Sequence, residues 1–229
     1  MKTIGLIGGL TWYSTLDYYR LLNELANKEL GGSHAAKIIL NSVDFGEIEV
    51  LTKKLDWDAL AVIMCNAAKA IETAGAHCLM IGANTMHNIA DEVQAAISIP
   101  VIHIADAVAA SIKKQRLKKV TLLGTKYTMQ LDFYKARLAA AGIEVIIPNE
   151  TGIELINDAI YNEFGKGIFL PERKKQFLEI IDSLVADGAE GIVLGCTEIP
   201  ILIKQEDCSV PVFDTAFIHA QAAVHFAIS

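Results

Sequence analysis

The residues best suited to chemistry in this chain are Cys196 and Thr197, which follow a short aliphatic run. The run, residues 191–194, is too short for a helix and predicts a strand buried on both faces, and Gly195 ends it. Open parallel sheets place reactive groups at the carboxyl ends of their strands. Cysteine can move protons, because its thiol pKa of roughly 8.5 is lowered by a helix N-terminus or a cation. The alternative for Cys196 is a core thiol, since free cysteine is commonly buried.

A strand of the same kind ends at a matching place in the first half of the chain. There the run at residues 78–81 leads into Gly82 and Ala83, just as residues 191–194 lead into Gly195 and Cys196. Residues 3–8 match residues 120–125 in the same way. From Gly8 to Ala83 is 75 positions, and from Gly124 to Cys196 is 72. Two copies of one α/β unit explain this spacing, although short strand-glycine patterns also recur by chance.

The rest of the chain alternates short aliphatic runs with longer amphipathic segments, the pattern of an α/β protein with mainly parallel sheets. We expect two similar domains, residues 1–105 plus 213–229 and residues 106–212, related by pseudo-twofold symmetry, with the active site in the cleft between them. The C-terminal helix should pack on the first domain. The expected strands are residues 3–7, 36–40, 77–81, 99–104, 120–125, 191–194 and 210–213, and the expected helices are residues 16–30, 56–74, 88–98, 105–118 and 216–228.

Composition excludes several classes of protein. A chain of 229 residues that is 52% hydrophobic and 21% charged can bury a large core. Its net charge of −7 argues against a nucleic-acid partner. Neither a signal peptide nor an apolar run of roughly 20 residues is present, so no membrane association is expected. Four cysteines without CxxC spacing indicate neither a metal site nor a disulfide framework, which favours a reducing cytoplasm.

Five segments in order resemble the cofactor-independent aspartate/glutamate racemase superfamily, and most closely its bacterial aspartate/glutamate or broad-specificity amino-acid racemase branch. The segments are residues 3–9, 84–87, 123–125, 195–198 and 211–215. The resemblance implies an isomerase that inverts aspartate or glutamate without PLP or another cofactor, and it implies a homodimer. Members usually carry one cysteine at a strand end in each domain. Cys196 takes one of these positions, but Ala83 takes the other.

Ala83 leaves several hypotheses open, because alanine cannot move a proton. The protein could be a one-cysteine racemase, slow or biased in direction, in which Thr85, His87 or a water serves the second face. It could be a decarboxylase or lyase that needs one protonating cysteine, an amino-acid-binding relative, or a chain whose cysteine has been replaced. A Rossmann-type nucleotide binder is a rival of another class, but residues 5–9 lack the G-x-G-x-x-G spacing.

An amino dicarboxylate needs donors for two carboxylates and an acceptor for its ammonium group. Backbone N–H groups at helix starts suit a carboxylate, whereas Asn84 and Thr85 could instead be helix caps. His87 could face the cleft and tune Cys196, or be structural; Glu198 could orient the site or cap the next turn. The expected substrate-binding residues are Gly9, Leu10, Thr11, Asn84, Thr85, Thr125 and Thr197, with Asp44 for the ammonium and, by the family resemblance, Lys166 for the distal carboxylate.

Overall fold

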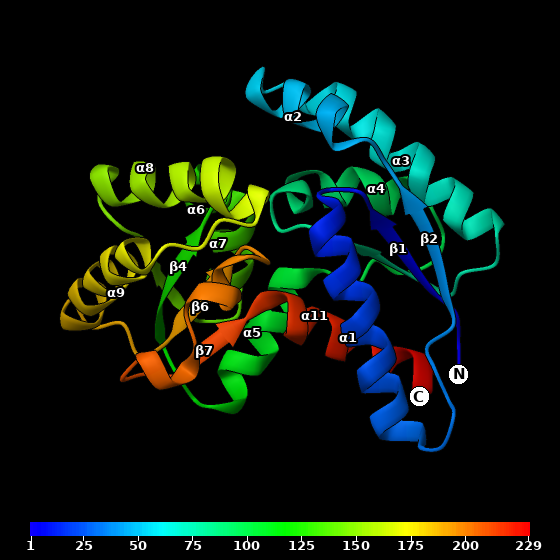
Figure 1. The fold of residues 1–229 in the computed structure, drawn as a ribbon. Helices are drawn as coiled ribbons and strands as arrows, with labels where there is room; N and C mark the ends of the chain where they lie inside the picture. The colour runs from blue at the N-terminus through cyan, green and yellow to red at the C-terminus, as the bar shows by residue number, and fades with distance from the viewer. The chain divides into compact units, whose positions relative to one another are not determined.

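The computed structural model describes residues 1–229 and divides the chain into two compact units. The first unit comprises Met1–His103 and His219–Ser229, and the second comprises Ile104–Ile218. Each unit contains one parallel sheet with helices beside it (Figure 1). The α/β fold predicted from the alternation of aliphatic and amphipathic segments is therefore confirmed.

The sheet of the first unit has three strands in the order β2-β1-β3. They are β1 (Ile4–Gly8), β2 (Ile38–Ser42) and β3 (Cys78–Ile81). The central strand pairs in parallel with both neighbours, so all three carboxyl ends lie at one edge of the sheet. Strands β1 and β3 are buried throughout, as their unbroken aliphatic sequences predict.

Two glycines of β1 show which helix covers each face of this sheet. A β-carbon added at Gly5 would collide with Ile71 of α3 (Trp57–Thr73), and one added at Gly8 would lie 2.6 Å from Thr15 of α1 (Trp12–Leu30). Residues three apart on a strand point to opposite faces. Helices α1 and α3 therefore cover opposite faces, and both pack against glycine at close range (Figure 1).

Three further α-helices and one short helical turn complete the first unit. Helix α11 begins in the second unit and ends in the first, where the Lys2 N–H donates to the Ala227 carbonyl at 2.7 Å. None of the helices of the chain combines the length and the apolar character that a membrane crossing requires. The bounds are α2 (Phe45–Lys53), η1 (Thr85–Ile89), α4 (Ala90–Ala96) and α11 (Thr215–Ile228).

The second unit repeats this arrangement and adds one strand. Its sheet has the order β5-β4-β6-β7, so the first strand in sequence is again central and the third again lies beside it. Val120 and Leu122 pack with α5 and α7 on one face, while Leu123 packs with α8 and α9 on the other. The bounds are α5 (Ile104–Lys114), β4 (Lys119–Gly124), α6 (Lys126–Gln130), α7 (Asp132–Ala140), β5 (Glu144–Ile146), α8 (Glu150–Asp158), η2 (Ala159–Glu163), η3 (Phe164–Lys166), α9 (Pro171–Ala186), β6 (Ile192–Gly195), α10 (Ile199–Leu202), η4 (Gln205–Asp207) and β7 (Val212–Asp214).

Several element predictions are corrected. Helix α1 begins four residues before the predicted start, because the Thr11 side chain accepts from the Ser14 N–H and caps it. The predicted strand at 99–104 is wrong: Val101 forms only an isolated bridge to Leu79, since Pro100 has no N–H to donate. Helix α5 ends at Lys114 rather than at 118, before Arg116 adopts a left-handed φ of 61°. The elements α2 and β5 were not predicted, and neither were the helices α6 to α10 of the second unit.

Candidate functional site

The carboxyl ends of β4 and β6 place Thr125 and Cys196 at one edge of the second sheet. The two strands are parallel neighbours, with Gly124 in register with Gly195. A β-carbon at Gly124 would lie 2.7 Å from the Gly195 carbonyl oxygen, so the strands can end this close together only because both residues are glycine. Thr125 then caps α6 by accepting from the Thr128 N–H at 3.3 Å.

Cys196 lies in a small hydrogen-bonded group with the two residues that follow it. Its Sγ donates to Glu198 Oε2 at 2.9 Å, and the Thr197 hydroxyl donates to the same oxygen at 2.7 Å. The Cys196 and Glu198 residues are only 9% and 7% exposed. Glu198 is therefore not the cap of the next turn, because its side chain makes no capping bond to α10.

The surroundings of Cys196 hold its proton on sulfur. Burial raises the pKa of the Cys196 thiol well above its usual value, and the negative charge of Glu198 and its hydrogen bond raise it further. The backbone N–H groups of Glu198 and Ile199 act in the opposite direction with smaller effect. The resting group is thus a neutral thiol, whereas the sequence suggested a thiol of lowered pKa.

The matching edge of the first sheet carries Gly9 after β1 and Ala83 after β3. Gly9 has a φ of 76°, and a β-carbon there would collide with the backbone of Val43, so glycine is required. Its N–H donates to Thr15 Oγ1 at 2.8 Å. Leu10 is buried and Thr11 is half-buried at the start of α1. Ala83 itself is half-buried and offers only a methyl group where Cys196 offers a thiol.

Three buried histidines, His87, His103 and His219, lie close together, and His87 contacts the backbone of Ala83. His87 Nδ1 lies 2.8 Å from the Ala83 carbonyl oxygen, and since a carbonyl only accepts, Nδ1 carries a proton. The His87 ring centroid is 4.6 Å from that of His103 and 5.4 Å from that of His219. The sequence singled out His87 but not its two neighbours, which are close in space and distant in the chain.

His219 joins three segments of the first unit. Its Nε2–H donates to the Ile102 carbonyl at 2.6 Å, which leaves Nδ1 to accept from the Tyr18 hydroxyl at 3.0 Å. Burial lowers the pKa of His219 to about 4, and the bond to Ile102 offsets this only in part. The imidazole is therefore neutral near pH 7.

The remaining predicted site residues are distributed over both units. Asn84 and Thr85 are buried beside Ala83, and the Asn84 side chain does not cap the helical turn that follows it. Asp44 is exposed and caps α2 by accepting from the Gly46 N–H at 3.0 Å. Lys166 is exposed in η3, and Thr197 is half-buried beside Cys196.

Comparison with known proteins places both strand ends inside a region that matches one protein family. The model of the Asp/Glu/Hydantoin racemase family matches residues 7–223, which include both of them. This chain belongs to that family. It is 48% identical to an Asp/Glu racemase candidate from Yersinia pestis, over all of both chains and with a TM-score of 0.95. It is 40% identical to an aspartate racemase homologue from Pyrococcus horikoshii OT3, again over all of both chains, with a TM-score of 0.88.

A third relative is the broad specificity amino-acid racemase RacX of Bacillus subtilis. It is 22% identical to the chain, and the match covers 96% of each protein. Membership of the Asp/Glu/Hydantoin racemase family confirms the resemblance that the five segments indicated. It also confirms the prediction that the chain is an isomerase of the racemase type.

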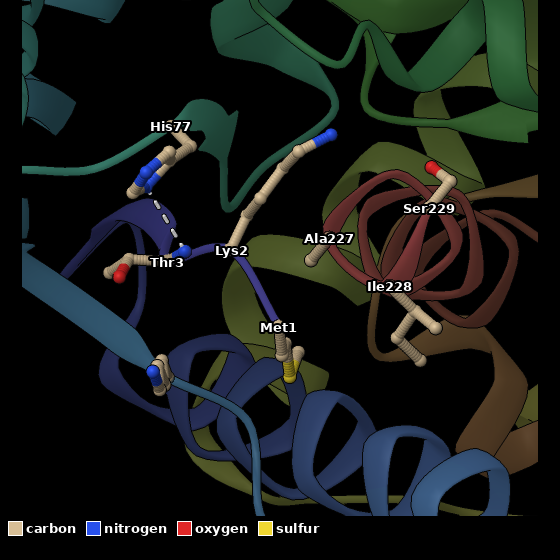
Figure 2. A pocket seen from close by; sticks show the side chains of 8 residues that line it. Met1, Lys2, Thr3, His77, Ala227, Ile228 and Ser229 are labelled. Carbon is tan, nitrogen blue, oxygen red and sulfur yellow. Dashed lines mark hydrogen bonds between the residues drawn. The ribbon is translucent and has the colours of Figure 1, made fainter.

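A hollow of about 420 Å³ lies at the amino ends of the strands of the first sheet, opposite the end that carries Gly9 and Ala83. Figure 2 shows this hollow, where the Thr3 N–H donates to His77 Nδ1 at 3.2 Å just before β1 and β3 begin. The Lys2 ammonium lies 4.6 Å from the centroid of the Phe226 ring. None of the predicted site residues lines this hollow, so it is not part of the candidate site.

Proposed function

We propose that the protein is a cofactor-independent racemase of aspartate or glutamate in which Cys196 moves the α-proton on one face of the substrate. The observation that carries this proposal is the Cys196 thiol at the carboxyl end of β6, 2.9 Å from a buried carboxylate. Sulfur is a competent acid and base for a carbon acid. The relatives named as aspartate and amino-acid racemases support the choice of substrate.

The reaction requires two proton transfers on opposite faces of the α-carbon. In one direction the thiolate of Cys196 removes the α-proton and becomes the thiol, the electron pair stays on carbon, and a second acid protonates the other face. In the reverse direction the Cys196 thiol protonates the carbanion. The donors proposed to hold the carboxylates while charge develops are Gly9, Leu10, Thr11, Asn84, Thr85, Thr125 and Thr197, with Lys166 for the distal carboxylate. Asp44 is the proposed acceptor for the ammonium group.

Ala83 makes the proposed reaction asymmetric. Its methyl group cannot hold a proton, so the second face is served by water or by a weak neighbour such as Thr85. Because proton transfer by a positioned side chain contributes about 10²–10⁴-fold, the face without one is expected to be slow. Both directions pass through this slow transfer, so we expect racemisation to be slow in both. Because enantiomers have equal free energy, kcat/KM is the same in the two directions, and a directional bias is confined to kcat and KM separately.

A second candidate function follows from the protonation state of Cys196. A neutral thiol can protonate a carbanion without first losing a proton, and a decarboxylase or lyase needs only that step. The proton held on sulfur and the methyl group of Ala83 both favour such a one-thiol reaction. Release of carbon dioxide, or of another fragment, from an acidic substrate would distinguish it from racemisation.

The experiment for the proposed function follows L- and D-aspartate and L- and D-glutamate by circular dichroism with the purified protein. Loss of optical rotation without change in the total amino acid supports the racemase. Isothermal titration on the same samples records binding. Binding without loss of optical activity would overturn the racemase in favour of an amino-acid-binding relative, and neither binding nor turnover would overturn both.

We also propose that the chain forms a homodimer through the exposed face of α1. Trp12, Leu16 and Tyr19 recur at helical spacing and are 55–58% exposed. Together with Tyr13 and Leu40, these side chains expose an apolar area on the order of 500 Å² to water. This figure takes about 150–250 Å² as the area of one aromatic side chain. Each partner of a standard interface buries about 800 Å², so a second copy of this patch supplies most of a stable contact.

The dimer proposal predicts that Leu16→Glu halves the molar mass measured by light scattering, because it places a charge in an apolar contact. The matched control is Val62→Glu, which changes an exposed apolar residue of α3 that is outside the patch. A monomeric wild-type protein, or a Leu16→Glu protein of unchanged mass, would contradict this assignment.

All four cysteines are free thiols, which supports a reducing cytoplasm as the compartment.

A further inference from the structure

The hollow at the amino ends of the first sheet is lined by basic side chains and by no acidic one. Its lining includes Lys2, Lys37 and His77, but neither aspartate nor glutamate. The whole chain has 27 acidic and 20 basic residues, so this gathering of basic groups runs against its net charge of −7. The main-chain ends at Met1 and Ser229 also lie here, and their opposite charges cancel. The hollow therefore suits an anion.

The pairing of the strands places two of these side chains on one face of the sheet. Strand β1 is in register with β2 and β3 at Ile4, and the row just before it consists of Thr3, Lys37 and His77. The Ile4 N–H donates to the Lys37 carbonyl at 2.8 Å. The His77 N–H donates to the Thr3 carbonyl, also at 2.8 Å, so the pairing continues through this row. Residues of one row point to the same face, and with strands about 4.8 Å apart Lys37 and His77 lie about 10 Å from each other.

A hydrogen bond fixes which nitrogen of His77 is available to a ligand. The Thr3 N–H donates to His77 Nδ1 at 3.2 Å. Nδ1 is therefore an acceptor, and Nε2 carries the proton of the neutral imidazole. Figure 2 shows Lys2 between His77 and the end of α11. The three basic side chains thus offer two ammonium groups and one ring N–H, which complement an oxyanion.

We propose that this hollow binds the phosphate group of a small organic phosphate ester. Lysine suits phosphate, because its ammonium group acts as a compact point charge and needs no bidentate geometry. Part of the lining is apolar and comes from Ala227 and Ile228 of α11, which can cover the carbon body of the ligand. The volume of about 420 Å³ lies within the range of small-molecule sites, about 300–1,000 Å³. The hollow has room for an ester and not only for the free ion.

This binding site is separate from the chemistry proposed for the strand ends. It lies where β1 and β3 begin, whereas Gly9 and Ala83 follow the residues where these strands end. Binding of a phosphate ester here requires no turnover of an amino acid. The proposed racemase function can therefore fail while this inference holds, and the reverse is also true.

The test is an NMR titration of the full chain, without a tag at either end, with phenyl phosphate at constant ionic strength. The amide signals of Thr3, Lys37 and His77 should shift and saturate. Lys37→Glu should weaken binding by about tenfold, because it replaces an attractive charge with a repulsive one. Lys69→Glu is the matched control, since it makes the same charge change at an exposed residue of α3 outside the hollow, and it should leave the affinity unchanged.

Two further probes test the class of ligand. Inorganic phosphate lacks the carbon body and should bind more weakly than phenyl phosphate. Benzoate keeps the ring but has a singly charged carboxylate, and it should also bind more weakly. Equal affinity for benzoate would overturn the choice of phosphate, and equal affinity for inorganic phosphate would overturn the choice of an ester. Amide signals that do not saturate, or an affinity that Lys37→Glu leaves unchanged, would overturn the site itself.

Discussion

The carboxyl ends of β3 and β6 occupy equivalent positions in two parallel sheets of similar strand order, and they carry different side chains. Both strands lie beside the central strand of their sheet, and both run into glycine. The second strand end carries the Cys196 thiol, which is hydrogen-bonded to a buried carboxylate. The first carries the Ala83 methyl group, and the Ala83 backbone carbonyl accepts from His87. The two strand ends are alike in topology, but only one of them has a side chain that can carry a proton.

The difference separates what the fold requires from what the chemistry requires. Gly82 and Gly195 are both held by sterics, since a β-carbon at either would lie 2.9–3.0 Å from a neighbouring backbone oxygen. The next residue is alanine in the first unit and cysteine in the second. A strand end can therefore lose its acid or base without losing its shape.

The largest predicted effect comes from removing the thiol of the second strand end. Cys196→Ser should lower racemisation in both directions by about 10²–10⁴-fold, because an alcohol is a far weaker acid and its anion is not available near neutral pH. Steady-state circular dichroism with each enantiomer measures this. Cys208→Ser, a half-buried cysteine outside both strand ends, should retain activity. Equal loss in the two variants would contradict a specific role for Cys196.

The next effect concerns acid stability, which should reside in the buried His219 of the first unit. The pKa of His219 is about 4 in the folded protein and 6.5 without perturbation, so the unfolded chain binds its proton first. The resulting stability is complete above pH 6.5 and is lost as pH falls through about 4, amounting to on the order of 3 kcal/mol. Urea unfolding across this range should show the loss.

His219→Gln is the variant that isolates this effect. It should unfold at lower urea concentration than the wild type near pH 7, but the difference should shrink toward pH 4, because glutamine does not titrate. His34→Gln is the control, since His34 is exposed. A wild-type protein whose unfolding free energy is the same at pH 4 and pH 7 would refute the assignment of a buried neutral imidazole.

A smaller effect is expected from restoring the missing group. Ala83→Cys should raise kcat/KM by about tenfold in both directions, since the second face takes part in each. This is less than a fully supported acid or base contributes, because no carboxylate is paired with the new thiol. Ala83→Ser has nearly the same size and should not accelerate it. Acceleration by serine as well would show that a bound hydroxyl or water, rather than a thiol, limits the second face.

The sequence predicted the parts of this comparison that depend on local patterns. Buried aliphatic runs ending in glycine located β1, β3, β4 and β6, and the residues that follow them located Ala83 and Cys196. What local patterns could not show is how side chains are used. Glu198 is two residues after Cys196, and sequence alone could not distinguish a helix cap from an acceptor for the thiol.

Contacts between distant residues were also beyond prediction. Tyr18 and His219 are 201 residues apart and meet only because α1 and α11 pack in the same unit. Residues 99–104 show the opposite failure, because an aliphatic run that reads as a strand is interrupted by Pro100 and forms a single bridge. Tertiary packing decides the first case, whereas in the second the missing N–H of Pro100 limits the strand pairing.

The central claim is that a single thiol serves one face of the substrate. It is tested most directly by NMR in deuterated water, comparing α-proton exchange with inversion for L- and D-aspartate. The account predicts that one enantiomer gains deuterium with retention faster than it inverts, because Cys196 removes and returns the proton on the same face. It also predicts that the other enantiomer shows no such excess. Exchange that never exceeds inversion for either enantiomer, or that exceeds it equally for both, would contradict the claim.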